Sequence, residues 1–165
     1  MQFPAHSPHL RLAKASRYHH NSMTLTPIGH IRSTLTDRTN APRQAAEGAP
    51  SATLEILPAY ASALEGLHPN QDLWILTWLH EADRETLRVH PRSDPLNPLT
   101  GVFATRSPDR PNPIGLHRVT LTRIDGLTLH LAALEAIDGT PILDMKPVLS
   151  TEGTPDRSLC EKPPR

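Results

Sequence analysis

One segment of the sequence combines anion-binding side chains with a backbone that is already restricted. It runs from Gly101 to Leu116 and reads GVFATRSPDRPNPIGL. Its three prolines fix their own φ and bias each preceding residue toward extended geometry, so little backbone freedom remains to be lost on binding. Arg106 and Arg110 therefore present two guanidinium groups from a shaped loop, which suits an anionic or planar ligand. The same residues also fit a proline-rich corner with solvated arginines.

Length and composition predict a single compact domain. The chain has 165 residues, 37% of them hydrophobic, which is enough for a modest core. The formal net charge is zero and only 4% of residues are aromatic. These values argue against nucleic-acid binding through bulk charge or a wall of stacking rings. Seven arginines between residues 84 and 123 leave a local basic face possible, although such a run also fits ordinary solvated surface.

Cysteine content and hydropathy indicate the class of protein. Cys160 is the only cysteine, which excludes a disulfide framework or a cysteine-based zinc site within one chain. We therefore expect no bound metal. No apolar run has the length needed to cross a bilayer, so we also expect a cytoplasmic protein without a membrane partner. Residues 1–22 and 151–165 are polar and aperiodic, and we expect a disordered N-terminal arm and a flexible C-terminal tail around a domain of residues 23–150. Met23 is an alternative initiator.

The elements that must position the arginine loop are mainly strands. Asp125-Gly126 lies between two alternating segments and predicts a two-residue hairpin turn. The best helix is short, over residues 59–67. Strands and helices do not alternate, and no two glycines form a G-x-G pair, so a Rossmann cofactor domain is excluded. Short strands joined by turns predict an all-β, mainly antiparallel barrel. The expected strands cover residues 25–33, 53–57, 73–79, 86–89, 102–104, 114–124, 127–134 and 142–144.

Five motifs in a fixed order resemble those of one known family. They are PIGHIRS at 27–33, PRQ at 42–44, LEGL with DLWIL at 64–76, TGVFATRSPDRPNPIGL at 100–116, and AIDGTPILDMKP at 136–147. Together they resemble the TsaA-like family, whose named members are TrmO-type tRNA N6-threonylcarbamoyladenosine methyltransferases. The resemblance covers residues 24–149. It implies a single-sheet β-barrel that binds S-adenosylmethionine outside the Rossmann architecture and works as a homodimer.

The resemblance also implies a cofactor site. Arg43 or Arg106 would pair with the cofactor carboxylate, and carboxylates would accept hydrogen bonds from its ammonium group or ribose hydroxyls. Taken singly, His80 equally fits a strand cap, and Asp138 with Gly139 fits a simple turn. The implied cofactor-binding residues are Pro42, Arg43, Gln44, His80, Glu81, Arg106, Leu116, Leu134, Glu135 and Asp138.

Methyl transfer from a sulfonium is an in-line displacement, so it demands alignment and exclusion of water more than acid–base groups. The acceptor nitrogen must still lose a proton, and Asp144, Glu81 and His80 are the candidate acceptors. Lys146 or Arg110 would face the threonyl carboxylate or a phosphate of the substrate. The expected catalytic residues are therefore Asp144, Lys146 and Arg110. A structural ion pair at a strand end is the alternative for Asp144 and Lys146.

The chain departs from the family pattern at two points. Val148 stands where the family commonly has a tyrosine after the KP pair, and the chain ends soon after the last motif. The resemblance implies an S-adenosylmethionine-dependent N6-methyltransferase acting on threonylcarbamoyl-adenosine beside the tRNA anticodon, with tRNA as partner, and this is the function we expect. The two departures leave methylation of a nitrogen on a small molecule, or cofactor binding without catalysis, as the alternatives.

Overall fold

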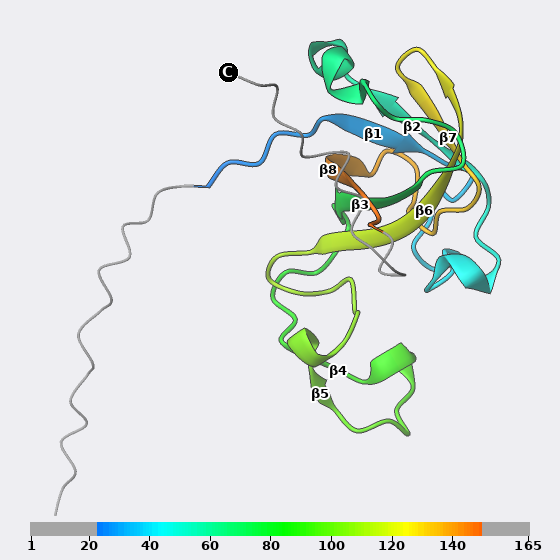
Figure 1. Cartoon of the computed structure of the whole chain (residues 1–165). Coiled ribbons are helices and arrows are strands. Elements are labelled where there is room, and N and C mark those ends of the chain that lie inside the picture. The colour runs from blue at the N-terminus through cyan, green and yellow to red at the C-terminus, as the bar shows by residue number, and fades with distance from the viewer. Residues whose placement is uncertain (1–22, 150–165) are drawn as a thin grey trace, which may run out of the picture.

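The described part of the chain forms a closed antiparallel β-barrel. A computed structural model describes residues 23–149. Its strands are β1 (Gly29–Arg32), β2 (Ala52–Ile56), β3 (Asp72–Trp78), β6 (Ile114–Asp125), β7 (Thr128–Leu131) and β8 (Pro141–Pro147). They pair in the order β1-β2-β7-β6-β3-β8, and β1 closes the ring because it pairs with both β2 and β8 (Figure 1). The predicted all-β, mainly antiparallel barrel is confirmed.

The barrel interior is filled by alternate residues of each strand, as the two-residue period of a strand requires. Leu73 and Ile75 of β3 point inward and are buried, and Val119 and Leu121 of β6 do the same. Most inward side chains are aliphatic and form one continuous core. Thr77 and His117 are polar exceptions on β3 and β6, at the end of the barrel where those strands meet the arginine loop.

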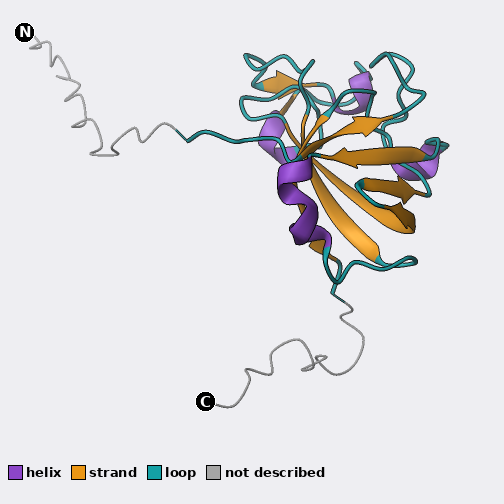
Figure 2. Ribbon diagram, turned by 90° about the horizontal axis from the view of Figure 1, so that it is seen from above, coloured by secondary structure: helices purple, strands orange, loops and turns teal. Residues whose placement is uncertain are grey.

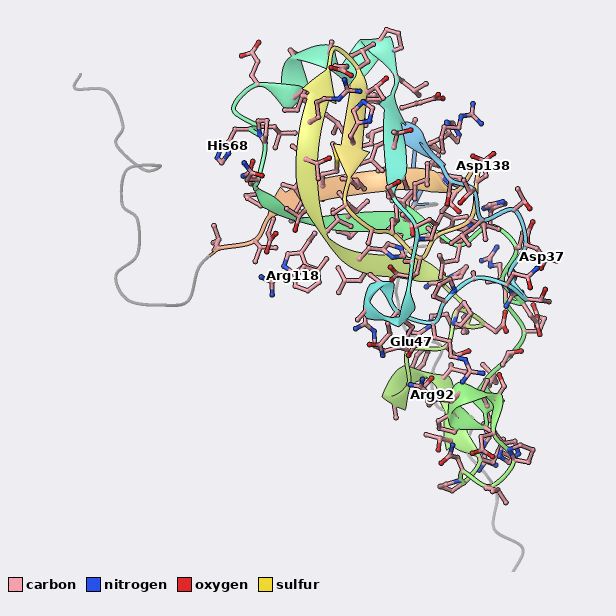
Figure 3. The ribbon with its side chains drawn as sticks, turned by 90° about the vertical axis from the view of Figure 1, so that its right-hand side faces the viewer. Asp37, Glu47, His68, Arg92, Arg118 and Asp138 are labelled. Atoms are coloured by element: carbon pink, nitrogen blue, oxygen red, sulfur yellow. The ribbon has the colours of Figure 1, made fainter. Side chains whose placement is uncertain are left out.

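A small arm projects from the barrel between β3 and β6, below it in Figure 1. Its two strands, β4 (Arg88–Val89) and β5 (Thr100–Gly101), pair only with each other, so the predicted strand at 86–89 lies outside the barrel. The arm also carries the 3-10 helix η3 (Pro91–Ser93). Arg92 of η3 forms an ion pair of 2.8 Å with Glu47 of η1 (Ala45–Glu47), which joins the arm to the barrel side (Figure 3).

The helical segments of residues 23–149 are short 3-10 helices, drawn in purple in Figure 2. The helix expected at 59–67 is present as η2 (Pro58–Leu64). It begins at a proline, which is favourable at a first helical position, and Gly66 follows it with a positive φ of 88°. Tyr60 and Leu64 pack against the barrel core, so η2 covers one side of the barrel.

The strand predicted at 102–104 is wrong, because Val102–Ala104 form the 3-10 helix η4. The carbonyl oxygen of Val102 accepts bonds from the backbone N–H and the hydroxyl of Thr105, at 3.1 and 2.9 Å. It also accepts a bond from Arg110 at 3.2 Å. These local donors occupy a carbonyl that a strand would offer to its neighbour, and Phe103 is left 82% exposed. Apolar composition predicted a strand where local hydrogen bonds form a turn.

The hairpin predicted at Asp125-Gly126 is present but shifted by one residue. Asp125 pairs with Thr128, so the two turn residues are Gly126 and Leu127. Gly126 has a φ of 57°, and Leu127 is not among the residues with positive φ. Glycine at the first turn position with an ordinary residue at the second is typical of a type II′ turn, whereas the prediction assumed positive φ at both positions.

Residues 23–149 contain no helix with the length and apolar character that crossing a lipid bilayer requires.

Candidate functional site

A cavity of about 450 Å³ lies where β3 ends and β6 begins. Four segments line it: residues 38–44, residues 79–82 after β3, residues 105–117 of the arginine loop and β6, and residues 135–140 before β8. Its size is within the range of small-molecule sites, and its walls combine apolar side chains with charges of both signs. The apolar part comes from Leu79, Ile114, Leu116, Ala136 and Ile137.

The arginine loop uses its two guanidinium groups differently. Arg110 donates from Nε to the carbonyl of Ser107 at 2.8 Å and from Nη2 to the carbonyls of Thr105 and Val102 at 2.8 and 3.2 Å. It therefore braces its own loop as well as lining the cavity. Arg106 donates one bond of 3.0 Å to the carbonyl of Leu116 and keeps its other donors available to a ligand.

A third arginine fastens the segment that carries the PRQ motif. Arg38 donates from Nη1 to the carbonyl of Glu81 at 2.6 Å and forms an ion pair of 2.8 Å with Asp109. The same oxygen of Asp109 accepts the backbone N–H of Asp83 at 2.8 Å. The Arg38–Asp109 pair thus ties together three of the segments that line the cavity, and both side chains are only partly exposed to solvent.

Glu135 lies in the cavity wall and is held from behind by His117. Its Oε1 is 2.8 Å from Nδ1 of His117, and Nε2 of His117 is 2.9 Å from the hydroxyl of Thr77. The side chains of Glu135 and His117 are 18% and 6% exposed. Gly115 leaves space for the hydrogen bond between His117 and Thr77. A Cβ at position 115 would contact the Thr77 hydroxyl and lie 2.6 Å from Nε2 of His117.

The protonation of Glu135 reflects two opposing effects. Burial raises the pKa of Glu135 by disfavouring the charged form. The hydrogen bond and charge of His117 lower it, with smaller contributions from the backbone and from Arg106. The lowering effects prevail, so the pKa of Glu135 lies below its ordinary value and the cavity contains a carboxylate at neutral pH.

The cavity gathers nine of the residues singled out from the sequence: Pro42, Arg43, Gln44, His80, Glu81, Arg106, Arg110, Leu116 and Glu135. They come from four segments that are distant in sequence and adjacent only because the barrel is closed. His80 and Glu81 lie at the exposed mouth of the cavity, directly after β3.

The structure does not bring the remaining four to the cavity. Leu134 is fully buried in the barrel core. Asp138 accepts the backbone N–H of Ser33 at 3.1 Å and lines a separate open groove with Arg32. Asp144 and Lys146 form an ion pair of 2.8 Å on the outer face of β8, opposite Leu76 and Trp74 of β3. The structural ion pair that was the alternative for these two residues is therefore present.

The position of the missing tyrosine is also separate from the cavity. The backbone N–H of Val148 donates to the carbonyl of Asp72 at 2.9 Å, at the first residue of β3. The cavity lies at the other end of this strand, after Trp78. The substitution of valine for tyrosine therefore leaves the described cavity wall unchanged.

Sequence reasoning missed His117, Thr77 and Arg38. His117 had a usable signal, because it occupies an inward position of the alternating strand that also carries Val119 and Leu121. A polar residue at a core position needs a hydrogen-bond partner, but its partner Glu135 is 18 residues further along the chain. Arg38 had no signal, since its partners come from two other loops.

The cavity suits a ligand with both an anionic and a cationic group. Arg43 and Arg106 can pair with a carboxylate or phosphate, while Glu81 and Glu135 can accept bonds from an ammonium group or from hydroxyls. The apolar side chains can contact a ring. Within residues 23–149, no three His, Cys, Asp or Glu side chains are grouped so that they could hold a metal ion.

The chain is similar in sequence to several known proteins. Residues 30–152 match the family described as the tRNA-methyltransferase O N-terminal domain. Among curated proteins, the chain is 41% identical over 134 residues to VirR of Rhizobium radiobacter, described as a probable S-adenosyl-L-methionine-binding protein. That match covers 81% of this chain and 71% of VirR. A protein of the same description from Methanothermobacter thermautotrophicus is 40% identical, over 74% of this chain and 88% of its own length.

Solved structures give the same similarity. The crystal structure of TrmO from Pseudomonas aeruginosa superposes with a TM-score of 0.64 and 35% sequence identity. The match covers 84% of this chain but only 61% of the TrmO chain. The chain therefore spans less than two thirds of that solved TrmO protein.

Arg38→Ala should loosen the cavity wall, because it removes two charge-assisted hydrogen bonds that hold residues 38–44. We expect amide hydrogen exchange across residues 38–49 to accelerate about fivefold, which corresponds to about 1 kcal/mol after allowance for solvent screening. Hydrogen-exchange mass spectrometry measures this.

Arg32→Ala is the matched control, because Arg32 is also ion-paired but lines no part of the cavity. Equal exchange in the two variants would show that Arg38 does not fasten this segment.

Proposed function

This chain belongs to the family of the tRNA-methyltransferase O N-terminal domain, and from that premise we propose that it is an S-adenosylmethionine-dependent methyltransferase acting on N6 of threonylcarbamoyl-adenosine in tRNA. The observation that carries the proposal is the cavity at the end of β3, which gathers residues of the PRQ motif, the segment after β3, the arginine loop and the segment before β8.

The donors and acceptors of the cavity fit the cofactor. S-adenosylmethionine carries a carboxylate, an ammonium group, a sulfonium, ribose hydroxyls and an adenine ring. Arg43 and Arg106 would hold the carboxylate, and Glu135 with Glu81 would accept bonds from the ammonium group or the hydroxyls. Leu116 and Ile137 would contact the ring. The carboxylate and the ammonium group of the cofactor would thus each meet a group of opposite charge in the same cavity.

The bound cofactor supplies an electrophilic methyl group. The protein has to bring the acceptor nitrogen in line with it and to exclude water, which the apolar wall around Leu79 and Ile114 favours. The acceptor would exchange its N–H bond for an N–C bond while the S–CH3 bond of the cofactor breaks and leaves a neutral thioether, so one proton must be taken up from the nitrogen. Of the three acceptors considered from the sequence, His80 and Glu81 line the cavity and Asp144 does not. We therefore assign this proton to His80 or Glu81.

The acceptor is the part of the proposal with an alternative. The chain has a formal net charge of zero. This also fits methylation of a nitrogen on a smaller molecule, because phosphate contacts with tRNA require positive charge. A steep fall of acceptor affinity with salt is expected for tRNA and is absent for a small neutral acceptor.

We further infer a homodimer, with the arm as its interface. Three apolar side chains of the arm, Leu96, Phe103 and Leu87, are 94%, 82% and 64% exposed, and an interface over the arm would remove this apolar surface from water. Light scattering is expected to give twice the mass of the chain for the wild type and one chain mass for Phe103→Asp. A wild-type monomer at micromolar concentration would overturn the dimer.

Cofactor pairing generates a prediction for the arginines. Arg43→Ala and Arg106→Ala should each weaken S-adenosylmethionine binding by more than about 1 kcal/mol, or fivefold, because each removes a charge-assisted bond. Isothermal titration calorimetry measures the affinity. Arg118→Ala is the control, since Arg118 pairs with Asp72 on the outside of the barrel and lines no part of the cavity (Figure 3).

Decarboxylated S-adenosylmethionine makes that assignment specific. If an arginine pairs with the carboxylate, its replacement should matter much less for this analogue, so that the two changes are not additive. If the arginine substitution and the loss of the cofactor carboxylate weaken binding additively, that arginine does not pair with the carboxylate.

The reaction itself is tested on nucleosides. The purified protein is incubated with S-adenosylmethionine and total tRNA that carries threonylcarbamoyl-adenosine, and the digested nucleosides are analysed by mass spectrometry. We expect a gain of one methyl group on that nucleoside. No gain, with cofactor binding confirmed by calorimetry in the same preparation, would reject tRNA as the acceptor and favour a small molecule or a non-catalytic role.

A further inference from the structure

Three polar side chains form a continuous chain from the cavity into the barrel core. Glu135 is in the cavity wall, His117 lies behind it, and Thr77 is fully buried behind His117. The two hydrogen bonds measure 2.8 and 2.9 Å. Within residues 23–149, no buried side-chain nitrogen or oxygen lacks a hydrogen-bond partner. The buried polar atoms of Glu135, His117 and Thr77 therefore all have hydrogen-bond partners.

The chemistry of the groups fixes the positions of the protons. An ionised carboxylate only accepts hydrogen bonds, so Nδ1 of His117 carries the proton that points to Glu135. In the neutral imidazole Nε2 accepts from the Thr77 hydroxyl, and in the imidazolium Nε2–H donates to the same hydroxyl oxygen, because a hydroxyl can do either. Glu135 thus fixes the proton on Nδ1, and Thr77 satisfies Nε2 in both protonation states of the ring.

The order of the groups matches a hydroxyl–imidazole–carboxylate triad, but the direction is reversed. In a nucleophilic triad the hydroxyl faces the substrate and the carboxylate is buried. Here Thr77 is 0% exposed, and the carboxylate of Glu135 faces the cavity. Thr77 cannot reach a ligand, so this network acts on the carboxylate.

We propose that His117 is a positioning residue, which holds Glu135 ionised and in one orientation so that its second oxygen, Oε2, accepts a hydrogen bond from the ammonium group or a ribose hydroxyl of the bound cofactor. The identity of the ligand rests on the proposed function, whereas the action of His117 on Glu135 does not.

Two neighbours support this role. Gly115 has no side chain where a Cβ would press on both Thr77 and His117, so the strand leaves room for the hydrogen bond between them. The guanidinium of Arg106 donates to the carbonyl of Leu116 and forms no ion pair with Glu135. His117 is therefore the side chain that orients this carboxylate.

Two substitutions separate positioning from simple packing. Asparagine can place an N–H donor close to the position of Nδ1, whereas leucine fills the space without a donor. We expect His117→Leu to weaken S-adenosylmethionine binding about tenfold near neutral pH, and His117→Asn to recover most of that loss. Calorimetry measures both, and equal affinities for the two variants would overturn the proposal.

The pH dependence gives a readout that a packing role would not change. Without His117, burial raises the pKa of Glu135, so His117→Leu should lose cofactor affinity at a higher pH than the wild type as the pH falls. The other charged or titratable groups of the cavity are Arg38, Arg43, His80, Glu81, Arg106 and Arg110. They are the same in His117→Leu and His117→Asn, and neither variant has a titratable group at position 117, so the difference between the profiles of these two variants reports Glu135. Glu135→Gln should bind S-adenosylmethionine weakly, and its affinity should not show this shift in pH dependence.

Nuclear magnetic resonance of the ligand-free wild type tests the network directly. We expect the proton of His117 on Nδ1, and a Glu135 carboxyl that titrates below its ordinary value. A proton on Nε2 alone, or ordinary titration of Glu135, would overturn the proposal even if His117→Leu failed to fold. If S-adenosylmethionine does not bind the wild type at all, the proposed function fails while this measurement still decides the role of His117.

Discussion

Closure of the barrel between β1 and β8 is the constraint on which the cavity depends. Gly29 and His30 pair with Ile142 and Pro141, and Ile31 exchanges backbone bonds of 2.9 and 2.8 Å with Thr140 and Gly139. These bonds anchor the segment just before β8 across the end of the barrel. Glu135 is thereby placed beside the first residues of β6, which carry His117. Without this closure the acidic and basic walls of the cavity would belong to separate parts of the chain.

The opposite wall depends on a division of labour between two arginines. Prolines restrict the backbone of the arginine loop, but Arg110 also fixes it by donating to three of its carbonyls. Its Nε and Nη2 bond inside the loop, where they satisfy carbonyls that a neighbouring strand would otherwise bond. Arg106 is held at the cavity with donors remaining for a ligand. A chain of zero net charge therefore presents a locally charged site.

Alternation and turn signals in the sequence were sufficient for the barrel strands, because each strand depends on its own inward side chains. They failed at Val102, where local donors determine the backbone. The motifs grouped Leu134 with Glu135, but adjacent residues point to opposite sides, and only Glu135 reaches the cavity. Asp144 belongs to the last motif, but it lies on the outer face of β8, away from the cavity. The partner of His117 comes from a different segment, and such a pairing is visible only once the barrel closes.

The choice of histidine behind Glu135 has an electrostatic consequence. An arginine in this position would carry a permanent positive charge and could donate to both carboxylate oxygens at once. The imidazole of His117 donates from Nδ1 to Oε1 alone, so Oε2 can accept a bond from a ligand. Because the site is largely shielded from water, the remaining negative charge attracts an ammonium or sulfonium group more strongly than the same carboxylate would at the surface. Thr77 and Gly115 support this arrangement from the core, since Thr77 bonds Nε2 of His117 and Gly115 leaves the space for that bond.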